Sequence, residues 1–213
     1  MSSNMHFYRP AQGHGLSHDP FKAIVAPRPI GWISSVNRNG VRNLAPYSFF
    51  NGFNDKPPII GFSSLGYKDT VRNVEETGEF VWNLVTRPLA EAMNLSSAVV
   101  QPHIDEFVLA RLTPAESKTV KAPRVLESPV SFECVRTQIL QLSRADGSTV
   151  QTWVVFGEVV GVHISCSLLK NGIYDTAAAQ PIARGGGLED YFEITKDAYF
   201  RLKWPPVVAG GVE

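Results

Sequence analysis

The chain has 213 residues, of which 44% are hydrophobic and 19% charged, as in a folded globular protein with one sizeable core. Twenty Lys and Arg residues balance twenty Asp and Glu residues, which leaves no basic field for nucleic acid or an anionic membrane. The N-terminus lacks an apolar leader, no stretch is long enough to span a membrane, and the two cysteines form no CxxC pair. We therefore expect a reduced, cytoplasmic protein.

Residues 1–26 are rich in His, Gly and Pro and are typical of an extended N-terminal arm, while residues 1–213 as a whole are expected to form one domain. His14 and His18 have helical spacing, as two metal ligands would. Gly13, Gly15 and Pro20 disfavour a helix there, so we expect no metal site and favour a surface arm that lies on a partner subunit.

The unusual chemistry of the chain lies between Pro27 and Thr70. Three apolar segments, residues 30–36, 44–53 and 58–64, are expected to be strands, and Asn39-Gly40 indicates a two-residue hairpin turn between the first two. These strands carry more hydroxyl and amide groups than a plain core needs, namely Ser34, Ser35, Ser48, Asn51, Ser63 and Ser64. They are typical of the wall of a ligand site, although Ser34 and Ser35 also fit edge-strand hydroxyls.

The wall ends in Lys68-Asp69-Thr70, where a helix over residues 70–77 is expected, with Asp69 as its N-cap and Gly78 just past its end. An ammonium, a hydroxyl and the free N–H groups of a helix start together suit a phosphate monoester. An ordinary Asp cap beside an exposed Lys is the other interpretation. Ser63 and Ser64, one loop away, favour the phosphate site.

The rest of the chain continues this pattern of strands and short helices. Residues 79–85 are expected to be a strand with one conspicuous polar residue, Asn83. Two helices are expected over residues 88–98 and 103–112, followed by a polar connection over 114–129. Two long β-branched runs, 130–142 and 150–164, flank Ala145-Asp146-Gly147-Ser148 and predict an antiparallel hairpin, and a Gly-rich segment over 183–187 comes before the tail.

Many turn-linked strands with only three short helices predict a mostly β fold, an antiparallel barrel. No GxGxxG follows a strand, so NADH or NADPH is expected only as a transient co-substrate.

No catalytic nucleophile or acid–base pair stands out. Cys134 and Cys166 lack a context that lowers a thiol pKa, His163 is interpreted as a structural histidine, and Asp105-Glu106 as a solvated helix start. A site of neutral hydrogen-bonding groups fits a protein that holds a cofactor and lets the cofactor do the chemistry.

Several motifs resemble those of the flavin reductase-like, FMN-binding split-barrel family, which includes flavoredoxins. They are PRPIGWISSVNRNGVRNLAPYSFFNGFNDKPPIIGFSS, KDT, GEFVWNLV, HIDEFVLARLT, SPVSFEC, FGEVVGVHI and an Arg-Gly-Gly…Tyr tail that includes Arg184 and Tyr191. The resemblance covers roughly residues 20–200. It implies a Greek-key split β-barrel with a few short helices, a homodimer, and FMN bound near the subunit interface.

The resemblance also implies the cofactor-binding residues. Ser63, Ser64, Lys68 and Thr70, with Asp69 between the last two, would hold the phosphate. The isoalloxazine would lie along residues 43–48, which include Asn43, Ala45, Pro46, Tyr47 and Ser48. Trp32 and Ser34 would belong to the pocket wall, with Asn83 and Arg184 as further contacts or as dimer-interface residues. Gly185 stands where the family commonly has Leu.

Three functions fit these expectations. The leading one is an FMN-dependent oxidoreductase that uses NADH or NADPH and supplies a monooxygenase or another redox protein. The second is a flavoredoxin-like electron carrier with tightly bound FMN and little NAD(P)H activity. The third is a barrel that has lost the cofactor and acts as a binding module, which the complete Ser63-Ser64…Lys68-Asp69-Thr70 set disfavours.

Overall fold

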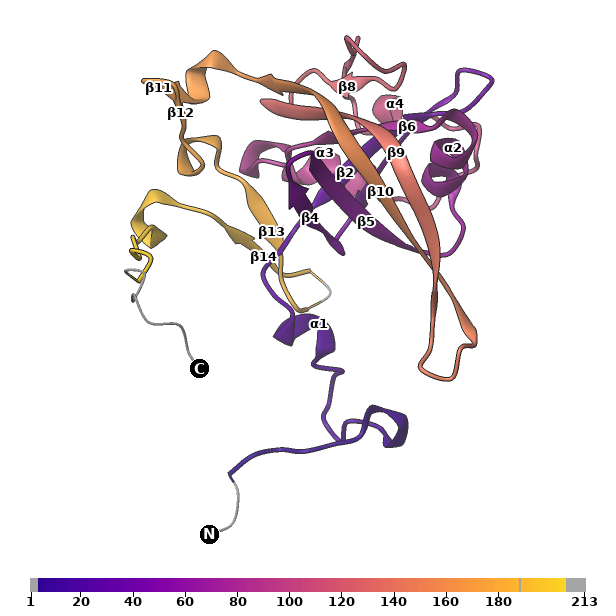
Figure 1. Ribbon diagram of the computed structural model, residues 1–213, viewed down its shortest axis with the longest axis vertical. Coiled ribbons are helices and arrows are strands. Elements are labelled where there is room, and N and C mark those ends of the chain that lie inside the picture. Colours follow the sequence, from indigo (N-terminus) through magenta and orange to yellow (C-terminus); the bar gives the residue numbers. More distant parts are fainter. Residues whose placement is uncertain (1–3, 188, 206–213) are drawn as a thin grey trace, which may run out of the picture.

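A computed structural model describes residues 4–187 and 189–205. Its centre is a seven-stranded antiparallel sheet with the strand order β3-β2-β6-β9-β10-β5-β4 (Figure 1). The strands are β2 (Gly31–Val36), β3 (Arg42–Tyr47), β4 (Phe50–Asp55), β5 (Pro58–Leu65), β6 (Glu79–Asn83), β9 (Val130–Ser143) and β10 (Thr149–Ile164). The long β9–β10 hairpin that the sequence predicts is confirmed.

The sheet curls until its two ends approach each other without closing. The rings of Tyr47 on β3 and Phe62 on β5 lie 4.6 Å apart, although four strands separate β3 from β5 in the sheet order. This is the expected split barrel. Its interior is filled by a cluster that includes Ile33, Phe62 and Phe80, all less than 2% exposed.

Short elements surround the barrel. The helices are α1 (Phe21–Ile24), α2 (Asp69–Thr77), α3 (Ala90–Leu95) and α4 (Glu106–Leu109). Single 3-10 turns cover Pro10–Gln12, Arg87–Leu89, Cys166–Leu168, Ala177–Ala179 and Lys196–Ala198. A small sheet joins β1 (Arg28–Pro29), β13 (Ile182–Arg184) and β14 (Tyr191–Glu193), and two ribbons pair β7 (Pro114–Ala115) with β8 (Arg124–Val125) and β11 (Leu169–Lys170) with β12 (Ile173–Tyr174).

Strand β2 is buried on both faces, so its sequence shows no alternation of polar and apolar residues. Ile33 faces the barrel interior, while Trp32 joins a second cluster under α3 and α4 with Leu44, Met93 and Phe107. Ser34 and Ser35 are therefore interior residues of a central strand, and the alternative interpretation as edge-strand hydroxyls is wrong.

The segment expected as one strand over residues 44–53 is two strands. β3 ends at Tyr47 and β4 begins at Phe50, and the two lie at opposite edges of the sheet. The Asn39-Gly40 turn also differs from the expected two-residue turn. Asn37 and Val41 pair through a backbone hydrogen bond, which leaves a three-residue loop with Gly40 at a φ of 81°.

The two helices expected over 88–98 and 103–112 are shorter than predicted. The first is a 3-10 turn followed by α3, and the second shrinks to α4. Asp105 caps α4 by accepting a hydrogen bond from the Phe107 N–H. The connection over 114–129, expected to be a polar connection, buries Val120, Ala122 and Val125.

The N-terminal segment up to α1 projects away from the barrel, as does the chain beyond β14 (Figure 1). Arg28 anchors the segment around α1 through hydrogen bonds. Its guanidinium donates to the backbone carbonyls of Ser48, Lys22, Val25 and Gly185, and so links α1, β1 and the Gly-rich segment. No helix among residues 4–187 and 189–205 is both long and apolar enough to cross a membrane.

Candidate functional site

Half of the predicted site residues meet in one cavity of about 250 Å³, which we call the Lys68 cavity. It lies between the end of β3, the start of α2 and the segment after α3. Its lining includes Asn43, Ala45, Pro46, Tyr47, Lys68, Asp69 and Thr70, all named by the sequence, and Ser96 to Val100 and Glu106, which sequence reasoning missed.

The start of α2 differs from the expected one. The N-cap residue is Lys68, not Asp69, and its side chain makes no capping hydrogen bond. Asp69 is the first helical residue, and its carboxylate pairs with Arg72 one turn later. The Asp69 carboxylate is thus engaged with Arg72 in an (i, i+3) ion pair.

This leaves a helix start without protein partners. Among the described residues, no group accepts a hydrogen bond from the backbone N–H of Asp69, Thr70 or Val71. Thr70 and Val71 are 1% and 0% exposed. A helix end with unpaired donors needs a hydrogen-bond partner, and such an end favours an anion. The exposed ammonium of Lys68 adds positive charge at the same place.

A hydrogen-bond network orders the wall of the cavity. Asn43 Nδ2 donates to Thr70 Oγ1 at 2.8 Å, and the Tyr47 hydroxyl lies close enough to the side chains of Thr70 and Ser64 for them to lower its pKa. Burial raises the pKa of Tyr47 to about 12, against the opposing effect of those two side chains, so Tyr47 is a neutral phenol at physiological pH. The hydroxyl of Ser64 also donates to the Gly66 carbonyl.

A second cavity of about 300 Å³, the Arg184 cavity, adjoins the first because Pro46 and Ser97 line both. Ile30, Ser48, Met93, Asn94, Arg184 and Tyr191 complete its lining. The guanidinium carbon of Arg184 lies 4.6 Å from the centre of the Tyr191 ring, a cation–π contact that holds the guanidinium on an aromatic surface. The two adjoining cavities have the uncapped start of α2 in the lining of one and the Arg184–Tyr191 pair in the lining of the other.

Ser63 lies elsewhere. Neighbouring residues of a strand point to opposite faces, so Ser63 lines a third cavity while Ser64 contacts the network of the first. This third cavity, the Phe49 cavity, has a volume of about 580 Å³ and a mostly apolar lining that includes Phe49, Phe50, Phe53 and Phe156, with Ser48 at its edge.

Trp32, Ser34 and Asn83 line none of the three cavities. Their polar atoms are used inside the protein. Trp32 Nε1 donates to Ser96 Oγ at 2.9 Å, and Ser34 Oγ donates to the Pro123 carbonyl at 2.5 Å. Asn83 is fully buried and makes four hydrogen bonds, to Trp32 O, Ser34 Oγ, Val125 N–H and Ser131 Oγ. These three residues have structural partners, and we leave them out of the candidate site.

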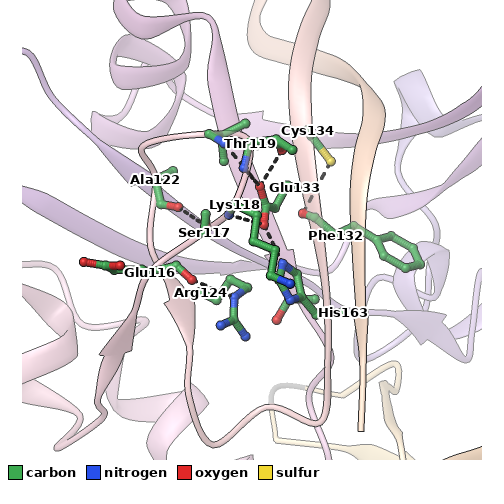
Figure 2. A network of polar contacts seen from close by, with 12 residues as sticks. Glu116, Ser117, Lys118, Thr119, Ala122, Arg124, Phe132, Glu133, Cys134 and His163 are labelled. Carbon is green, nitrogen blue, oxygen red and sulfur yellow. Dashed lines mark hydrogen bonds and ion pairs between the residues drawn. The ribbon is translucent and has the colours of Figure 1, made fainter. Parts of the chain in front are cut away.

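The other concentrated polar cluster surrounds Glu133 on β9 (Figure 2). This fully buried carboxylate accepts hydrogen bonds from the N–H groups of Lys118, Thr119 and Val120, from the Thr119 hydroxyl and from His163 Nε2. The cluster anchors the loop over 117–120 to the sheet. It confirms His163 as a structural histidine.

The chain was compared with known proteins. Residues 25–182 match the model of the flavin reductase like domain. An uncharacterized protein of Aquifex aeolicus is 38% identical over 170 residues, which are 77% of this chain and 83% of that protein.

The similar solved structures include two that share at least 30% identity with this chain. Nitrilotriacetate monooxygenase component B from Bacillus cereus has a TM-score of 0.83 at 32% identity and covers 94% of this chain and 100% of its own. The 2-nitrobenzoate 2-nitroreductase NbaA of Pseudomonas fluorescens has a TM-score of 0.77 at 30% identity, with coverage of 90% and 92%. The family model spans most of the chain and the similar structures share its open barrel, so this protein belongs to the family of flavin reductase like domains.

Proposed function

We propose that the protein is an FMN-binding oxidoreductase that reduces its flavin with NADH or NADPH. The observation that carries this proposal is the uncapped start of α2 beside Lys68, where Thr70 and Val71 are buried. The donor set fits a phosphate monoester, because it combines an ammonium with a row of backbone N–H groups. The phosphate would lie in the Lys68 cavity, and the ring would lie along residues 45–48 toward the Arg184 cavity.

The bound flavin would supply the redox chemistry by accepting and passing on two electrons. The residues of this chain would bind and orient it. Pro46 and Ser97 line both cavities, so they would lie between the phosphate and the ring of a bound FMN. Arg184, which lies over the ring of Tyr191, would offer positive charge near the flavin ring, which favours a reduced and more negative flavin. No side chain needs to act as a catalytic base.

We infer the electron acceptor from a similar protein. The similar Bacillus cereus protein is named as a component of a monooxygenase. We therefore propose that reduced flavin from this protein serves a monooxygenase or another redox protein, with the electron-carrier function as the second candidate.

A homodimer is part of the proposal. Several large apolar side chains in the terminal segments are more than 60% exposed in the single chain, namely Met5, Phe7, Ile24, Tyr199, Phe200, Leu202 and Trp204. Apolar surface of this extent is typical of an interface. Ile24 also lines the apolar Phe49 cavity, together with Val25.

An anaerobic absorbance scan of the purified protein, before and after NADH or NADPH is added, tests the proposal. Oxidised-flavin bands that bleach rapidly with either nicotinamide are the expected result. Bands that persist until dithionite is added would favour the electron carrier. If the protein contains no flavin and binds none when FMN is supplied, the proposed function is wrong.

A further inference from the structure

Glu106 places a carboxylate in the cavity proposed for a phosphate. It is the first residue of α4 and lines the Lys68 cavity. The sequence pattern indicates a solvated helix start, but Glu106 is only 6% exposed, because α4 packs on β3 and its Oε2 accepts a hydrogen bond from the Leu44 N–H at 3.1 Å. The expectation of a solvated Glu106 is wrong.

Two acidic residues near Glu106 form ion pairs, whereas Glu106 itself forms none with the residues that the structure describes. Asp69 pairs with Arg72 on α2, and Asp105 pairs with Arg42 on β3 at 2.6 Å. Within the described part of the chain, Glu106 lies within 4 Å of no Lys, Arg or His nitrogen. Tyr47 faces the same cavity as a neutral phenol, and Lys68 is the only cationic residue in its lining. Glu106 is thus the buried carboxylate whose charge no neighbouring cation neutralises.

Burial raises the pKa of Glu106, and the nearby charges of Asp69 and Asp105 raise it further, against hydrogen bonds from the N–H groups of Glu106 itself and Leu44. A phosphate monoester carries a charge of about −1.5 to −2 at neutral pH. A second anion brought beside a carboxylate disfavours its charged form. A proton on Glu106 removes that repulsion and turns the carboxyl into a hydrogen-bond donor.

We propose that Glu106 takes up one proton from solvent when the FMN phosphate enters the Lys68 cavity, and that this residue makes FMN retention depend on pH. This inference rests on the proposed function. A proton taken up on binding means that affinity falls as pH rises, by up to about tenfold per pH unit between the two ionisation midpoints of Glu106. The ionisation of the phosphate itself, near pH 6, acts in the opposite direction because the dianion binds Lys68 better.

Calorimetric titration of the apoprotein with FMN measures the proton directly. The binding enthalpy is recorded in buffers of different ionisation enthalpy at several values between about pH 6 and pH 9, and its dependence on the buffer gives the number of protons exchanged. We expect an uptake that approaches one proton at some pH in this range. Riboflavin, which has the ring without the phosphate, is expected to bind with no uptake.

Glu106→Gln removes the ionisation but keeps an oxygen that can accept from Leu44. We expect this variant to bind FMN without proton uptake and with an affinity that falls less with rising pH than that of the wild type. Glu91→Gln, which changes an exposed glutamate on α3, is the matched control and is expected to behave as the wild type.

The outcomes separate the two proposals. FMN binding without proton uptake, or equal uptake by the wild type and Glu106→Gln, overturns the role of Glu106 and leaves the FMN site intact. Equal uptake with riboflavin also overturns it, because the proton would not follow the phosphate. If the wild type fails to bind FMN at every pH, the proposed function fails and this inference fails with it. The riboflavin comparison needs no variant, so poor folding of Glu106→Gln would not prevent the test.

Discussion

His163 Nε2 on β10 lies 2.5 Å from Oε1 of Glu133 on β9, which joins a half-buried imidazole to a fully buried carboxylate (Figure 2). The carboxylate of Glu133 also receives three backbone N–H groups and one hydroxyl from the loop over 117–120. Burial alone would raise the pKa of Glu133, but the hydrogen bonds from Thr119, His163 and Lys118 outweigh it and lower the pKa to about 2.

This pair predicts how stability depends on pH. The pKa of Glu133 is about 2 in the folded protein and about 4 in the unfolded chain, so its contribution is present above pH 4 and is lost as pH falls toward 2. We expect Glu133→Gln to lower the free energy of unfolding by roughly 3 kcal/mol at neutral pH and by much less near pH 2. Urea titrations followed by circular dichroism at several pH values measure both.

Glu127→Gln is the control for this series, since Glu127 is an exposed glutamate that accepts a hydrogen bond from the Thr113 N–H. It is expected to leave the pH profile close to that of the wild type. A Glu133→Gln profile parallel to that of the wild type down to pH 2 would contradict the assignment.

Lys68→Ala tests the anion site. A lost hydrogen bond to a charged group costs about 1.5 to 3 kcal/mol, so we expect FMN affinity to fall roughly tenfold to a hundredfold with little change in thermal stability. Fluorescence titration of the apoprotein with FMN measures the affinity. Lys121→Ala removes an exposed lysine outside the cavity and should bind FMN as the wild type does. Unchanged affinity in Lys68→Ala would exclude Lys68 from the phosphate site.

Asn83→Ala tests whether a buried amide serves the fold or the cofactor. Its loss leaves the Val125 N–H and the Ser131 hydroxyl without their acceptor, and we expect the free energy of unfolding to fall by about 2 to 4 kcal/mol. FMN affinity per folded molecule should not change. Asn39→Ala, an exposed change in the β2–β3 loop, provides the comparison. A variant of normal stability that no longer binds FMN would show that Asn83 belongs to the FMN site.

Gly157→Ala tests the packing of β10 on the barrel interior. A Cβ atom at this position would lie 2.5 Å from the buried ring of Phe80, so the ring or the strand must move. We expect a loss of about 1 to 3 kcal/mol in thermal or urea unfolding. Gly52→Ala on β4 meets no atom within 4 Å and should cost far less. Equal stability of the two variants would show that this contact is loose.

Features that depend on neighbours along the chain were predictable from the amino-acid sequence. The β9–β10 hairpin was predictable because Asp146 and Gly147 suit its turn, where Asp146 Oδ1 accepts from the Ser148 N–H and Gly147 has a φ of 86°. The end of α2 at Gly78 was predictable for the same reason, since glycine adopts the left-handed cap at low cost. The family motifs also identified the fold and most of the Lys68 cavity.

Features that depend on contacts between distant segments became apparent only in the folded protein. Residues 44–53 form parts of two strands because the two halves pair with different neighbours. β3 pairs with β2, while β4 pairs with β5. The burial of Glu106 follows from the packing of α4 on β3, and the role of Asn83 follows from three segments that meet around one amide. Periodicity describes one segment at a time, so it cannot show which polar side chains face a cavity and which are enclosed by their neighbours.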